Sequence, residues 1–129
     1  MKIALYCDTG TQAIEQVLRE WGAVIVWKGG LDGQPENQLS QVPSPDTSCD
    51  LAVVALDGVT GVRNCRKLKE WRKSLPVLWI ADQEAFWRES RRIGVEEFLV
   101  KPVPDKTLCK VIGHMLSNIQ KSDAKNKLQ

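Results

Sequence analysis

The sequence has few of the residues from which catalytic and metal sites are usually built. Its 129 residues include a single histidine, His114, and four cysteines. The cysteines, Cys7, Cys49, Cys65 and Cys109, are widely separated and show no CxxC spacing, so neither a zinc site nor a redox motif is expected. No nucleophile is placed beside His114 by the spacing of the chain. We therefore predict reduced thiols that serve mainly in packing, and a protein that is not an enzyme.

Long apolar runs and a strong excess of one charge are also missing. No stretch approaches the roughly 20 apolar residues of a membrane span. The first apolar run is interrupted at Asp8, before it reaches the length of a signal peptide. A net charge of +2 is too small to make nucleic acid the default partner of this domain alone, and 43% hydrophobic residues are typical of a soluble globular domain. A cytoplasmic protein without a membrane partner is expected.

Apolar runs alternate with amphipathic segments along the chain. The predicted strands are residues 3–7, 23–27, 51–56, 76–80 and 97–100. The predicted helices are 11–21, 61–75, 83–93 and a last one from 105 to about 119. Residues 28–50 are polar and rich in turn-forming residues, which indicates a loop with at most a short helix near 36–41. Alternation of this kind predicts a parallel sheet with helices on both faces.

The chain is long enough for one domain, which we place at residues 1–119. Residues 120–129 are polar and contain few apolar side chains. They are expected to form a frayed tail or the start of a linker. Whether the 129 residues stand alone or belong to a longer protein is left open by the sequence.

The pair Lys101-Pro102 follows the last apolar run and gives the clearest family signal. The stretch 94–102 resembles the last strand and Lys-Pro turn of response-regulator receiver (CheY-like) domains. The stretches 50–54 and 75–80 are similar to the family's third and fourth strands. The resemblance implies a flavodoxin-like, doubly wound five-stranded parallel sheet in the order 2-1-3-4-5, in three α/β/α layers. It also implies a signalling role in a bacterial two-component-type system.

The resemblance implies five groups at the strand ends: two acids that hold Mg²⁺, an aspartate that accepts the phosphoryl group, a hydroxyl and a lysine. These positions fall on Cys7, Asp8, Ala55, Ala81 and Lys101. Asp8 and Lys101 keep the required chemistry, and Asp8 alone would bind a metal only weakly. The family's switch aromatic is present as Phe98. The phosphorylation site is therefore read as degenerate, which favours a pseudo-receiver without a cofactor that signals through protein contact.

A shifted alignment makes Asp57 the phosphoacceptor, and Mg²⁺ would then be required. Asp57 has the same strand parity as Ala55, so its carboxylate could point to the same side of the sheet. The turn from Asp57 to the next helix would be shorter than the family's by about four residues, against about two for Ala55. In this alternative the protein is an atypical but working response regulator. Lys101 could bind a phosphoryl group or another anion, but a structural salt bridge or hydrogen bond to Asp8 or Asp57 that holds the turn is favoured.

Two surface features suggest partners. The predicted helix 61–75 is rich in basic residues, namely Arg63, Arg66, Lys67, Lys69, Arg72 and Lys73. Such a run is usually a solvated helix face, but a cyclic-dinucleotide or nucleic-acid site is a further alternative. On the predicted helix 83–93, Trp87 is accompanied by Arg88, Arg91 and Arg92, a combination typical of interfaces, although Trp87 could instead pack on the edge of the sheet. A protein partner, an output domain or a second copy is expected on the fourth helix, fifth strand and fifth helix. Trp21, Trp71 and Trp79 are expected in the core.

Overall fold

The computed structural model describes residues 2–7, 12–28 and 50–128. Within these ranges five parallel strands form one sheet in the order β2-β1-β3-β4-β5. The strands are β1 (Lys2–Cys7), β2 (Val24–Lys28), β3 (Leu51–Ala55), β4 (Val77–Ala81) and β5 (Glu97–Val100). The predicted fold class and strand order are confirmed. The short helix expected at 36–41 lies outside the described residues.

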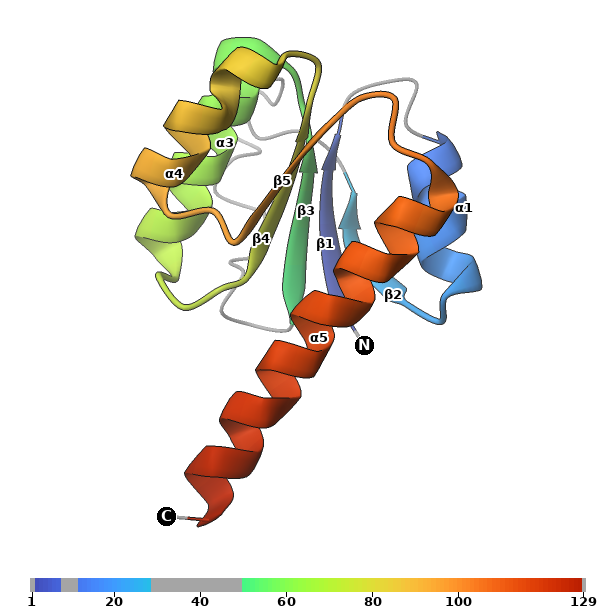
Figure 1. Ribbon diagram of the computed structural model, residues 1–129, viewed down its shortest axis with the longest axis vertical. Helices are drawn as coiled ribbons and strands as arrows, with labels where there is room; N and C mark the ends of the chain where they lie inside the picture. Colours follow the sequence, from blue (N-terminus) through green and yellow to red (C-terminus); the bar gives the residue numbers. More distant parts are fainter. Residues whose placement is uncertain (1, 8–11, 29–49, 129) are drawn as a thin grey trace.

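Helices cover both faces of this sheet. They are α1 (Gln12–Glu20), α3 (Gly58–Trp71), α4 (Trp87–Ile93) and α5 (Asp105–Leu128), with a 3₁₀ turn, η1 (Glu84–Phe86), before α4. Figure 1 shows α1 and α5 on one face and α3 and α4 on the other. The helix predicted at 83–93 is therefore divided into a 3₁₀ turn and a short α-helix. Gly94 ends it with a φ of 90°, a conformation that glycine adopts readily.

Two apolar layers hold the helices to the sheet, because successive strand residues point to opposite faces. On the α1–α5 face the core includes Leu5, Val53 and Ile80, all fully buried. On the α3–α4 face the neighbouring strand positions Tyr6, Val54 and Trp79 are equally buried. Burying one such side chain contributes about 1.5–3 kcal/mol relative to exposure. This burial on both faces explains why β3 and β4 contain no charged residue.

The last helix is longer than its sequence pattern predicted. Leu108, Ile112 and Met115 are buried against the sheet, as the periodicity indicated. The helix backbone then runs to Leu128 and extends beyond the sheet (Figure 1). A continuous helical backbone fits this sequence, because no glycine or proline interrupts residues 114–128. The domain bounds, 1–119, and the tail or linker at 120–129 stay predictions. No helix among the described residues is long and apolar enough to cross a membrane.

Two of the three tryptophans that were expected in the core lie there. Trp79 is fully buried and Trp71 packs against the α3–α4 core. Trp21 is 40% exposed, so placing it in the core was wrong. It directly follows α1, and its ring lies near Gly113 of α5. A residue just past the end of a helix does not have to lie on the helix's buried face, so Trp21 can be partly exposed.

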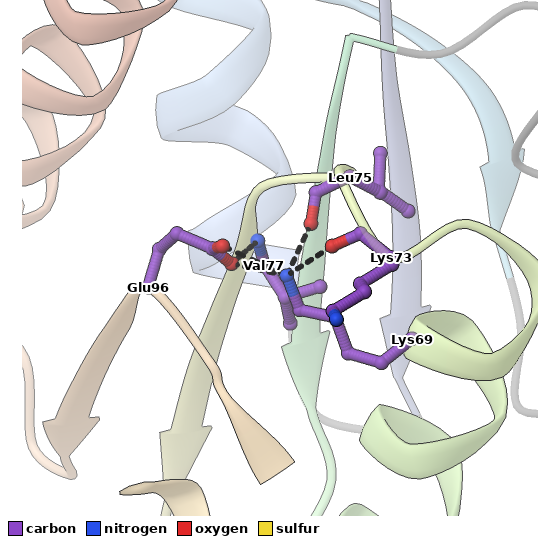
Figure 2. Close-up of polar contacts among 5 residues, drawn as sticks. All are labelled: Lys69, Lys73, Leu75, Val77 and Glu96. Carbon is purple, nitrogen blue, oxygen red and sulfur yellow. Dashed lines mark hydrogen bonds and ion pairs between the residues drawn. The ribbon is translucent and has the colours of Figure 1, made fainter.

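A buried lysine ties together three elements at the amino-terminal edge of the sheet (Figure 2). The side chain of Lys69, near the end of α3, is only 9% exposed. Its Nζ donates to both carboxylate oxygens of Glu96, at 2.7 and 2.8 Å, and to the carbonyl of Leu75 at 2.7 Å. Glu96 also accepts a hydrogen bond from the Val77 N–H at 2.9 Å. The cluster joins α3, the start of β4 and the residue before β5.

Candidate functional site

The carboxyl edge of the sheet carries the residues that the resemblance singled out. Cys7 ends β1 and is paired in register with Ala55, which ends β3. Ala81 ends β4, and its carbonyl accepts a 2.8 Å hydrogen bond from the Lys101 N–H, directly after β5. The structure therefore brings these four positions to one edge. Asp8, the expected metal ligand, lies outside the described residues.

Three of these positions offer no exposed polar group. Ala55 and Ala81 are fully buried and Cys7 is 6% exposed. Cys7 and Ala55 belong to the apolar core under α1 and α5, whereas Ala81 belongs to the core under α3 and α4. A methyl group neither accepts a phosphoryl group nor donates a hydrogen bond to one. These three side chains therefore pack in the hydrophobic core and offer no group to a ligand.

Lys101 is paired with Asp57. The Lys101 Nζ donates to Asp57 Oδ1 at 3.0 Å, across 44 residues of sequence. The side chains are 33% and 43% exposed, so water screens the pair, and it stabilises the fold by about 0.2–1 kcal/mol. The contact matters more for its position than for its energy. It places one carboxylate and one ammonium, both reachable from solvent, at the ligand-binding edge of an open α/β sheet.

Asp57 also begins a helix. It is the N-cap of α3, with φ −91° and ψ 153°, yet its carboxylate makes no capping hydrogen bond. An aspartate here normally accepts from the N–H two or three residues later. The carboxylate faces Lys101 instead. α3 begins at Gly58 rather than at the predicted residue 61, because Gly58 adopts a φ of 58° that allows a sharp entry.

An aromatic cluster lies beneath this turn. The indole N–H of Trp79, in β4, donates to the carbonyl of Leu56 at 3.0 Å. Its ring contacts Phe98 edge-on, with centroids 5.2 Å apart, and Phe86 at 5.8 Å. The predicted switch aromatic Phe98 is therefore packed inward on Trp79. A Cβ at Gly61 would lie 2.6 Å from Trp79 Nε1, so a glycine is required there. The roles of Phe86 and Gly61 were not predicted from the sequence; a glycine at the start of a helix-forming segment was the available signal.

The described residues fit a magnesium ion poorly. Mg²⁺ prefers several oxygen ligands in octahedral geometry. At this edge Cys7 supplies a buried sulfur, Ala55 supplies nothing, and one oxygen of Asp57 is occupied by Lys101. Among the described residues no group of three or more His, Cys, Asp or Glu side chains is gathered for a metal.

The predicted interface residues separate into two groups. Trp87 is 51% exposed, and the guanidinium of Arg91 lies 5.5 Å from its ring centroid. Trp87 and Arg88 line a groove of about 500 Å³ between α4 and β5, together with Glu84, Ala85, Phe98 and Val100. Arg92 faces α3 instead. It contributes to a second groove of about 340 Å³, which is lined by Arg66, Lys69, Glu70, Lys73, Arg92 and Ile93.

The basic surface of α3 and α4 is partly neutralised. Glu89 lies 3.7 Å from the guanidinium of Arg66 and 3.4 Å from that of Arg92. Lys69 is held by Glu96 at 2.7 Å and is largely buried. Acids interleaved with the cations reduce the attraction for a polyanion. The geometry therefore gives little support to nucleotide or nucleic-acid binding on this face.

Comparisons with known proteins agree with this fold. No protein-family model matches the sequence, and no curated protein sequence matches it. The structure is similar to a CheY-like receiver domain protein from Methanospirillum hungatei JF-1, with TM-score 0.74, 17% identity, and 94% of this chain and 97% of that chain covered. A receiver domain protein from Clostridium thermocellum gives TM-score 0.72 at 18% identity, covering 92% and 96%.

A third similar structure is the signal receiver domain of a modulated diguanylate cyclase from Desulfovibrio desulfuricans G20. Its TM-score is 0.71 at 20% identity, and 94% of this chain and 97% of that chain are covered. At such identities structural likeness establishes the fold. The chain has the CheY-like receiver fold, as the resemblance in its sequence implied.

Proposed function

We propose that this chain is a receiver-like signal-transduction domain that works through protein contact and independently of phosphorylation. The observation that carries the proposal is the pair of fully buried alanines, Ala55 and Ala81, at the carboxyl ends of β3 and β4. In the receiver resemblance these positions hold the phosphoacceptor and the hydroxyl that binds the phosphoryl oxygen. Cys7 replaces one of the paired acids. Phosphoryl transfer depends on such groups for positioning and charge compensation.

The Lys101–Asp57 pair supports the same proposal. The ammonium is compensated by a carboxylate 3.0 Å away that belongs to the protein itself. The turn that leads into α3 is therefore held without a phosphoryl group. A domain built in this way would present one constant surface to its partner.

The contact surface we propose is the groove between α4 and β5, continued onto α5. An exposed Trp87 beside Arg91 supplies a large amphipathic contact of the kind enriched at interfaces. The partner would be another protein, an output domain or a second copy of the chain. A cytoplasmic location is part of this proposal.

Incubation with acetyl phosphate and Mg²⁺, followed by intact-mass spectrometry, tests the proposal. A receiver domain with an intact phosphorylation site serves as the positive control, and Asp57→Asn as the matched variant. We expect no stable phosphoryl adduct on either form of this chain. An adduct on the wild type that disappears in Asp57→Asn would overturn the proposal.

A second candidate function is phosphorylation at Asp57, and one observation favours it. The Asp57 carboxylate is 43% exposed and already contacts the lysine that would neutralise a phosphoryl group. It also lies at the amino-terminus of α3, where the helix dipole favours an anion. Magnesium dependence discriminates the two functions: adduct formation that requires Mg²⁺ and is lost with EDTA would support this candidate.

A further inference from the structure

We propose that the groove of about 340 Å³ between α3 and α4 is a docking site for an acidic segment of a partner protein, in which carboxylates flank an apolar side chain. This groove shares no lining residue with the groove between α4 and β5. It is therefore a second surface, distinct from the contact surface proposed above. The inference goes beyond the proposed function and depends neither on the carboxyl edge of the sheet nor on phosphorylation.

The wall of the groove includes a cation that is already satisfied within the protein. Lys69 donates to Glu96 at 2.7 Å and to the carbonyls of Leu75 and Lys73 at 2.7 and 3.3 Å (Figure 2). An ammonium has three N–H donors, so these contacts use its capacity. Lys69 is also only 9% exposed. It therefore fixes the end of α3 and leaves the recognition of a partner to the exposed cations around it.

Two arginines, one from each helix, supply the unused donors. Arg66 on α3 is 60% exposed and Arg92 on α4 is 76% exposed. Both are directed at the carboxylate of Glu89, Arg66 at 3.7 Å, which is too long for a hydrogen bond, and Arg92 at 3.4 Å through one nitrogen. Each guanidinium has five N–H donors in a planar fork that matches a carboxylate. Glu89 thus holds two cations near each other while most of their donors stay available.

The charges around the groove alternate in sign, which decides between kinds of acidic partner. The exposed Lys73 adds a third cation, whereas Glu70 and Glu89 contribute acids. A regularly charged phosphate chain would bring an anion close to each of these acids. A protein segment can place its carboxylates beside the two arginines and leave the acids facing water. The arrangement therefore favours an acidic peptide over nucleic acid.

An apolar side chain completes the groove. Ile93, the last residue of α4, packs against the core under α3 and α4 but stays partly exposed, and this exposed part lines the groove. Exposed ion pairs alone add little to an affinity, because water and salt screen them. An apolar residue of the partner that covers Ile93 would exclude water from the neighbouring pairs. This is why the proposed segment carries an apolar side chain among its acids.

Titration of the ¹⁵N-labelled full chain with a defined peptide tests the proposal. The probe is acetyl-Glu-Glu-Leu-Glu-Glu-Leu-amide, and the counterpart with glutamine in place of glutamate keeps the leucines but removes the charge. We expect the glutamate peptide to cause saturable shifts of backbone amides, concentrated at residues 66–73 and 92–94, and the glutamine peptide to cause none. Added salt should weaken the binding, because it screens the exposed pairs.

Arg66→Gln/Arg92→Gln removes both guanidinium groups from the groove. The matched control, Arg63→Gln/Arg88→Gln, removes the same charge from the same two helices at exposed positions that do not line this groove. One exposed ion pair changes an affinity by up to about fivefold. We therefore expect the first double variant to raise the Kd of the glutamate peptide by about 5- to 20-fold, and the control to raise it by less than about twofold.

Four outcomes would overturn the proposal: equal binding of the two peptides, equal losses in the two double variants, no saturable shift at the groove, or tighter binding of an oligothymidylate than of the glutamate peptide. The oligothymidylate result would assign the groove to nucleic acid instead. If Arg66→Gln/Arg92→Gln does not fold, the comparison of the two peptides on the wild type decides alone. None of these measurements requires phosphate or Mg²⁺, so their failure leaves the proposed function standing.

Discussion

The buried lysine at the amino-terminal edge gives the sharpest stability prediction. Lys69→Met keeps the apolar stem but removes an ammonium that is 9% exposed and contacts both Glu96 and the Leu75 carbonyl. A hydrogen bond to a charged group contributes about 1.5–3 kcal/mol. Glu96 is 41% exposed and keeps the Val77 N–H, so water replaces part of the loss. We expect the free energy of unfolding to fall by about 2 kcal/mol, within the range for one such charged bond.

Glu96→Ala should cost more than Lys69→Met. It leaves the buried ammonium of Lys69 without its carboxylate and also removes the acceptor of the Val77 N–H. Breaking a fully buried ion pair costs about 3–5 kcal/mol, and the partial exposure of Glu96 places the expected loss near the lower end, at about 3 kcal/mol.

Urea denaturation followed by tryptophan fluorescence measures both losses. Arg19→Met is the matched control, because it breaks an ion pair on α1 whose arginine is 59% exposed and should cost only about 0.3–0.5 kcal/mol. The Lys69→Met/Glu96→Ala double variant completes a thermodynamic cycle. A Lys69→Met loss no larger than that of Arg19→Met, or a coupling energy near zero, would refute the reasoning.

Three further predictions concern Gly61, Cys65 and Trp87. Gly61→Ala forces a methyl group to within 2.4 Å of the Leu56 carbonyl oxygen and should lower stability by about 1–3 kcal/mol; thermal unfolding equal to wild type would contradict this. Burial raises the pKa of the Cys65 thiol well above its ordinary value of 9.0, with nearby Lys69 offsetting a small part. At pH values above the ordinary pKa of 9.0, the thiol is deprotonated in the unfolded chain but still protonated in the native protein. The free energy of unfolding should therefore fall by up to about 1.4 kcal/mol per pH unit. Urea unfolding at pH 8 and pH 10 checks this fall, which Cys65→Ala should abolish. Trp87→Ala removes a side chain that is 51% exposed and should change stability by less than about 0.5 kcal/mol; a large loss in urea unfolding would contradict its assignment to a contact surface.

Much of the fold could be predicted because the central strands leave little choice. β3 consists of five apolar residues, all buried, and such a run fits a strand covered on both faces. The stripe on α5 with Leu108, Ile112 and Met115 predicted its buried face correctly. The exact ends of the helices were harder to predict: α3 begins at Gly58, where a positive φ allows the turn, three residues before the predicted start at residue 61.

The candidate site was only partly predictable. The alignment placed Ala55, Ala81 and Lys101 at strand ends, where the structure has them. The Lys101–Asp57 contact joins residues 44 positions apart and was one of two alternatives from the sequence. Spacing along a chain does not specify which acid a lysine meets across a sheet edge.

The tertiary contacts around Lys69 and Trp79 could not be predicted from the sequence. Lys69 belonged to a run of basic residues that is usually exposed, and its partner Glu96 lies 27 residues away. The Trp79 cluster combines β4, η1 and β5 with the carbonyl of Leu56. Backbone carbonyls carry no residue-specific signal, so the sequence could identify a buried tryptophan but not the hydrogen bond that it donates.

Titration with beryllofluoride and Mg²⁺ tests the central claim most directly, because this ion mimics a phosphoryl group on an aspartate. The indole N–H resonances of Trp79 and Trp87 report on the site and on the contact surface. We predict that adding beryllofluoride and Mg²⁺ leaves the resonances of the wild type where they were before the addition, and that the same holds for Asp57→Asn measured against its own starting spectrum. Saturable, magnesium-dependent shifts in the wild type that are missing in Asp57→Asn would contradict this prediction and identify Asp57 as a working phosphoacceptor.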